Sequence, residues 1–151
     1  MCPLRSGTDF FVTGQDGVNS FIGNGNLQPT ATCAAAQLNG TYAFNGNGFA
    51  LNSNAIAGVN YISGLLTFDG VGAATGDWYV AAGGPSAPVL TTGTFTVSSN
   101  CTATATLTDS SGNAYALVIT ITNVTNAGAG TNFIAGASNA KMIFSASGRT
   151  L

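Results

Sequence analysis

The sequence predicts an all-β protein, either a single antiparallel β-barrel or a β-sandwich, with a β-like arm at its N-terminus. Side chains alternate strictly in two stretches. Threonines alternate with small apolar residues over Cys101–Thr108, and large apolar residues recur at every second position from Tyr115 to Ile121. A period of two that is rich in β-branched residues is typical of strands. Turn signals recur at a spacing typical of a barrel or sandwich, and the chain has no helical period of useful length.

The arm is expected over residues 1–37, where strand-like pieces at Asp9–Val12 and Val18–Ile22 flank a Gly-rich turn. Two interpretations of these pieces stay open. They form an extra hairpin that packs on its own domain, or they add a strand to the sheet of a neighbouring subunit. The residues expected at such an intermolecular contact are Cys2, Phe10, Phe11, Val12, Phe21 and Ile22.

The barrel or sandwich domain is expected over residues 38–151. Before it, Thr32–Leu38 forms at most a short turn. Gly40–Phe44 opens the first strand, and Asn45–Gly48 is predicted to be a tight turn, because Asn and Gly tolerate positive φ. Asp69-Gly70 is a second favoured hairpin turn. The other expected strands are Val59–Phe68, Gly76–Ala81, Val89–Val97, Cys101–Thr108, Tyr115–Val124, Asn132–Ala135 and Lys141–Ser145, with a loop over Gly83–Pro88.

Charge is scarce along the whole chain. Charged residues make up 5% of the chain, with three Lys or Arg and five Asp or Glu, whereas an ordinary soluble domain carries about 25% charged residues. The chain has no His. Three scattered cations cannot neutralise a phosphate backbone, so nucleic acid is excluded as a partner. The lack of His removes imidazole catalysis and the commonest metal ligand. No apolar run reaches the roughly 18 residues of a transmembrane helix.

The three cysteines allow two interpretations. Cys33 precedes the first strong strand signal and Cys101 begins a later strand, so a disulfide between them would tie the start of the domain to its middle. Cys2 would then be left to pair between chains or to stay free. Alternatively, all three are inert thiols. Their wide spacing, without His or nearby acids, excludes a zinc site.

No catalytic residue, cofactor or metal site is expected. A pair of carboxylates would require Asp69 and Asp77, but Asp69 lies in a turn sequence where Asp is favoured for local hydrogen bonding. No serine has a His partner or a nucleophile-elbow motif. We therefore expect a non-enzymatic protein, in which Trp78 belongs to the core.

Four segments carry a resemblance to a known family. Leu38–Phe44, Gly64–Gly72, Thr92–Val97 and Cys101–Thr104 occur in an order that resembles small, secreted, β-rich bacterial proteins of unassigned function. The resemblance covers roughly Cys33 to the end and implies a calycin-like barrel, export and a Cys33–Cys101 pair, but no activity. Family members often have Asp before the second Cys and Gly two residues after it, where this chain has Asn100 and Ala103.

Two functions follow as hypotheses. The first is an extracellular structural subunit that assembles with copies of itself into a filament or surface layer, because its strands lack the charges that protect sheet edges. The second is a secreted barrel that binds a small apolar ligand. The residues expected to line the ligand site or the core are Trp78, Tyr79, Phe44, Phe68 and Phe95.

Overall fold

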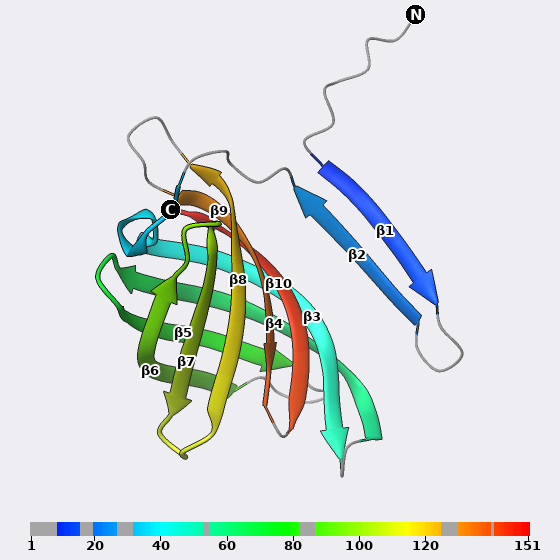
Figure 1. The fold of residues 1–151 in the computed structure, drawn as a ribbon. Helices are drawn as coiled ribbons and strands as arrows, with labels where there is room; N and C mark the ends of the chain where they lie inside the picture. Colours follow the sequence, from blue (N-terminus) through cyan, green and yellow to red (C-terminus); the bar gives the residue numbers. More distant parts are fainter. Residues whose placement is uncertain are drawn as a thin grey trace, which may run out of the picture.

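Eight antiparallel strands form a closed β-barrel (Figure 1). The computed structural model describes residues 9–15, 20–26, 32–52, 55–81, 87–124, 130–139 and 141–151. The all-β prediction is confirmed, and the architecture is a barrel and not a sandwich. The barrel strands are β3 (Asn39–Asn52), β4 (Ala55–Asp69), β5 (Ala73–Ala81), β6 (Ala87–Val97), β7 (Thr102–Asp109), β8 (Ala114–Val124), β9 (Gly130–Ser138) and β10 (Met142–Thr150).

The barrel strands follow one another as a simple meander. Each strand pairs with the next in sequence, and β10 returns to pair with β3, with Thr150 opposite Tyr42 and Met142 opposite Ala50. In Figure 1, β10 (red) lies between β9 (orange) and β3 (cyan). Every barrel strand therefore has a partner on both sides. Closure removes the exposed strand edges that an open sheet would have to protect.

The prediction of a tight turn at Asn45–Gly48 is wrong, because β3 runs through it without interruption. The two glycines of this segment serve close packing and not a reversal. A Cβ atom on Gly46 would lie 2.7 Å from Ala146 Cβ, and one on Gly48 would lie 2.5 Å from Phe144 Cα. Glycine in a strand interior often marks such a close backbone approach. The glycines thus let β10 lie close against β3.

The predicted turn at Asp69-Gly70 is confirmed between β4 and β5. One carboxylate oxygen, Asp69 Oδ1, accepts backbone N–H groups from Val71, Gly72 and Ala73 at 2.9, 2.8 and 2.9 Å. Gly70 and Gly72 have φ values of +77° and +144°, which strongly favour glycine. These hydrogen bonds to its charged form lower the pKa of Asp69.

The arm contains a β-hairpin that forms a sheet of its own. Strands β1 (Asp9–Gln15) and β2 (Ser20–Asn26) pair antiparallel with each other, in a ladder separate from the barrel (Figure 1). Before β3, the short turn expected at Thr32–Leu38 is a single 3₁₀ turn, η1 (Ala35–Gln37). Leu38, which follows it, is fully buried in the barrel core.

Aromatic rings fill much of the barrel interior. They pack edge-on or tilted, with ring centroids 5.0 to 6.0 Å apart. These ring contacts form two groups. Such arrangements add to the stabilisation that burial provides. One group joins Phe133, Tyr42, Phe68 and Phe95, and the other joins Phe44, Trp78 and Tyr115.

Candidate functional site

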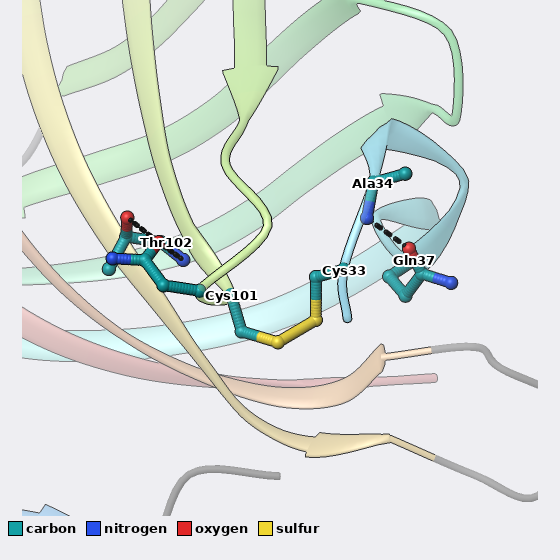
Figure 2. The surroundings of a disulfide bond; sticks show 6 residues. Cys33, Ala34, Gln37, Cys101 and Thr102 are labelled. Carbon is teal, nitrogen blue, oxygen red and sulfur yellow. Dashed lines mark hydrogen bonds between the residues drawn. A yellow bond between two sulfur atoms is a disulfide. The ribbon is translucent and has the colours of Figure 1, made fainter. Parts of the chain in front are cut away.

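The predicted disulfide joins Cys33 to Cys101 (Figure 2). It links the segment before β3 to the turn between β6 and β7, with 4.9 Å between the Cα atoms and a separation of 68 positions in sequence. Both cysteines are buried, and Cys101 holds a left-handed φ of 63°. The Cys33 N–H also donates to the Ser99 carbonyl at 3.2 Å. Cys2 lies outside the described residues.

Four of the five residues expected to line the core or a ligand site are buried in the barrel core. Phe44, Phe68, Trp78 and Phe95 are at most 6% exposed and take part in the ring contacts described above. Tyr79 instead lies on the outer wall and is 49% exposed. Successive side chains in a strand point to opposite faces, so an inward Trp78 puts Tyr79 outside.

Four polar side-chain atoms are buried without a hydrogen-bond partner in the described barrel, and two of them are the hydroxyl oxygens of Thr122 and Thr131. The other two are the Trp78 indole N–H, which is a donor, and Asn60 Oδ1, which is an acceptor. Their residues are 1% and 4% exposed. Buried polar groups in proteins are usually satisfied by protein or by ordered water. Each of these atoms therefore marks a position where the interior could accept a water molecule.

The residues expected at an intermolecular contact lie in the arm. Cys2 is outside the described residues, and for the other five the structure describes the backbone pairing only. In that pairing Val12 lies opposite Gly23, and Phe21 lies opposite Gly14. The five residues are Phe10, Phe11 and Val12 in β1, and Phe21 and Ile22 in β2.

The two aspartates considered as a catalytic pair lie apart. Asp77 on β5 is opposite Leu65, four positions before Asp69 on β4. Four strand residues span about 13 Å, whereas paired glycosidase carboxylates lie about 5–9.5 Å apart. The Asp69 carboxylate is moreover bound to three backbone N–H groups of its own turn.

A second aspartate organises the turn between β7 and β8. Asp109 Oδ1 accepts the backbone N–H groups of Ser111 and Asn113, both at 2.9 Å, while Oδ2 accepts the Asn113 amide at 2.8 Å and the Tyr115 hydroxyl at 3.1 Å. The Asn113 side chain is the largest cause of the lowered pKa of Asp109. Burial, with the hydrogen bond to Asp109, raises the pKa of Tyr115 to about 12.

The outer wall carries a hollow of about 510 Å³ over β9, β10 and β3. Two cross-strand rows line it, with Asn132, Arg149 and Ala43 in the first and Ile134, Ser147 and Asn45 in the second. The core residues Phe44 and Phe133 and the intervening Gly148 also line it. Thr122 of β8 also lines it and is only 8% exposed. Its hydroxyl is buried and has no hydrogen-bond partner in the described structure.

A second hollow, of about 490 Å³, adjoins the first over β3, β4 and β5. Asn45 lines both hollows, so they adjoin each other, and together they are called the outer groove, with lining residues from β8, β9, β10, β3, β4 and β5. The second hollow is bordered by Tyr61 and Tyr79, which are 65% and 49% exposed. Asn47 lies opposite Tyr61, and Ser63 lies opposite Tyr79. The tyrosines are thus diagonal neighbours, within reach of one ligand.

Three residues of the groove were not predicted from the sequence as site residues: Tyr61, Asn45 and Arg149. Asn45 was assigned to a turn, which hid its place on the outer face of β3. The available signal was the alternation in β4, where Tyr61 is out of phase with the inward Ile62. That signal becomes useful only when the register brings Tyr61 beside Tyr79.

None of the Cys and Asp residues in the described part of the chain gather in threes as metal ligands. Within the same part of the chain, no helix has the length and apolar character to cross a membrane. Comparisons with protein-family models, curated proteins and solved structures found no match for this chain. The family resemblance in the four segments therefore stays a prediction.

Proposed function

We propose that the protein is a non-catalytic extracellular structural subunit that assembles with copies of itself through the strands of its N-terminal hairpin. The observation that carries the proposal is a contrast between two sheets. Each barrel strand has two partner strands, whereas β1 and β2 pair only with each other in the described ladders. The outer edges of this hairpin are therefore the edges to which a further strand could add.

Physical chemistry favours the addition of a partner strand to this hairpin. An isolated two-stranded hairpin is marginally stable in water, and three or more strands with an apolar face are needed for independent stability. The hairpin sequence contains Phe10, Phe11, Val12, Phe21 and Ile22 and no lysine. Lysine is a common means by which proteins prevent pairing at an exposed edge.

Closure of the barrel limits where self-assembly by strand pairing, which the low charge of the chain suggested, can take place. A closed barrel has no edges to protect, so the scarcity of Lys and Glu on its strands needs no assembly to explain it. Assembly by strand pairing is assigned to the hairpin alone. Export is supported by the Cys33–Cys101 disulfide, since disulfides persist in oxidising compartments such as the extracellular space.

The alternative, a small apolar ligand inside the barrel, has less support. The interior aromatic rings contact one another, and both hollows described above lie on the outer wall. The unpartnered atoms of Trp78 and Asn60 also favour a polar occupant over an apolar one.

A matched pair of lysine variants of the full-length protein tests self-assembly. Val12→Lys puts a charge on β1, whereas Val118→Lys puts the same charge on the outer wall of β8, where Val118 is 59% exposed. We expect the unmodified protein to form oligomers or filaments, seen by sedimentation velocity and electron microscopy. Val12→Lys and Val12→Pro should yield monomers, and Val118→Lys should still assemble.

Two results would overturn the proposal. One is an unmodified protein that stays monomeric at high concentration. The other is equal loss of assembly in Val12→Lys and Val118→Lys, which would make charge alone responsible. Cys2→Ser in the same series separates strand pairing from intermolecular disulfides, because strand pairing predicts that this variant still assembles.

A further inference from the structure

The groove on the outer wall combines features that neither the fold nor hairpin assembly requires. It follows the row Ile134, Ser147, Asn45, Ser63 and Tyr79, which crosses β9, β10, β3, β4 and β5. Four steps between neighbouring strands span about 19 Å. The three central side chains are small and polar, and the larger side chains Ile134 and Tyr79 stand at the two ends. This shape suits an elongated ligand that lies across the strands.

The chemistry of the groove is polar with two exposed aromatic rings. Asn45, Asn47 and Asn132 each carry an amide that both donates and accepts hydrogen bonds. Tyr61 and Tyr79 offer large, rigid and amphipathic surfaces that lose little conformational entropy on binding. A sugar ring presents the complementary combination, with hydroxyl groups around its rim and C–H groups on its faces.

Charge is placed asymmetrically along the groove. Arg149 is the one charged residue among its described lining residues, and it lies at the β10 end. Asp77 lies at the other end, on the outer face of β5 two residues before Tyr79. A guanidinium binds carboxylates with two parallel hydrogen bonds. An acidic group of the ligand would therefore lie near Arg149 and away from Asp77.

Thr122 supplies an independent observation at the first hollow. The residue lines the groove, and its hydroxyl is buried and has no hydrogen-bond partner in the described structure. Leaving a buried hydroxyl unsatisfied is unfavourable, so such groups normally find a partner. A ligand hydroxyl or carboxylate in the first hollow would provide one once the Thr122 side chain turns towards it.

We propose that this groove binds an acidic oligosaccharide, with sugar rings against Tyr61 and Tyr79 and a uronic-acid carboxylate on Arg149. The site is separate from the hairpin and does not depend on self-assembly. The formal net charge of the chain is −2, so general electrostatic attraction does not draw it to an acidic polymer. Specific contacts in the groove must supply the affinity.

Affinity electrophoresis of the full-length protein tests the proposal. Native gels contain polygalacturonate, alginate or hyaluronate, and migration is compared with that in a gel without polymer. Methyl-esterified polygalacturonate keeps the sugar backbone and removes the charge. We expect retardation by at least one acidic polymer. Tyr61→Ala and Tyr79→Ala should each weaken it at least tenfold, and Arg149→Gln should lower the affinity to that for the ester.

The matched control is Leu90→Ala, since Leu90 is 64% exposed on β6 and lies outside both hollows. It should bind like the unmodified protein. The proposal is overturned if none of the three acidic polymers retards the protein, or if both tyrosine variants bind normally. It is also overturned if those variants change only the oligomeric state, since the groove would then be an interface between copies. Val12→Lys should bind normally, which separates this test from that of assembly.

Discussion

The hydroxyl of Tyr42 on β3 donates a 2.7 Å hydrogen bond to the backbone carbonyl of Gly130 at the start of β9. The two residues are 88 positions apart in sequence, and β10 lies between their strands in the barrel. Tyr42 is fully buried, and this burial raises its pKa. One side chain thus connects strands on both sides of the seam where the barrel closes.

Removal of this hydroxyl should destabilise the barrel. In Tyr42→Phe the ring stays, but the Gly130 carbonyl loses its buried donor, which costs about 1–3 kcal/mol. Urea unfolding followed by tryptophan fluorescence measures the change. Tyr79→Phe is the control and should change stability by less than about 0.5 kcal/mol, because Tyr79 lies on the surface. Equal effects of the two variants would contradict a special role for the Tyr42 hydrogen bond.

The Cys33–Cys101 disulfide should contribute more than any single hydrogen bond. A loop closed over 68 residues stabilises a protein by about 4 kcal/mol in the chain-entropy model. The double variant Cys33→Ser/Cys101→Ser should therefore unfold about 8–16 °C lower in calorimetry. Cys2→Ser should leave this transition unchanged. A drop of similar size in Cys2→Ser would show that Cys2 takes part in a bond that stabilises the barrel.

The close approach of β10 to β3 should make Gly48 intolerant of a side chain. A Cβ there would lie 2.5 Å from the Cα atom of Phe144, so the strands must separate. Gly48→Ala should lower the free energy of unfolding by about 1–3 kcal/mol, the usual effect of overpacking. Gly136→Ala is the matched control, because a Cβ at that position meets nothing within 4 Å. Comparable unfolding midpoints in denaturant for Gly48→Ala and Gly136→Ala would contradict the close packing of β10 against β3.

The stability of the barrel should fall in alkaline solution. The native pKa of Tyr115 is raised from 10.0 to about 12, so the native state keeps its proton where the unfolded chain loses it. The stabilisation is complete below pH 10 and is lost as the pH rises towards 12. Thermal unfolding between pH 9 and 12 should show this decline. It should be shallower in Tyr115→Phe, where Tyr42 alone still contributes to the same trend.

Alternation along single strands was enough to predict the fold class. In β7, Ala103, Ala105 and Leu107 are buried while Thr104 and Thr106 are exposed, as their period of two requires. The Asp69-Gly70 turn was predictable for a similar reason, since its hydrogen bonds lie within a few residues. Both features depend on local chemistry, which a sequence displays directly.

Features that depend on contacts between distant strands were missed. The glycines in Asn45–Gly48 are typical of a turn by composition, but their role is set by Phe144 and Ala146 of β10, nearly a hundred residues away. The outer groove was missed for the same reason. Tyr61 and Tyr79 become neighbours only through the β4–β5 register, which no short pattern in either strand specifies.

The position of the disulfide divides the barrel into two mechanical halves. If the chain is pulled at residue 32 and at Leu151, force along the covalent chain passes from Cys33 directly to Cys101, and the backbone between them is not stretched. Strands β3 to β6 lie in this bypassed loop, whereas β7 to β10 lie in the loaded path. Only the last 50 residues (151 minus 101) could then extend. Their extended length is on the order of 170 Å, so in the proposed assembly, if load enters at these two points, the disulfide sets a limit on how far each barrel opens.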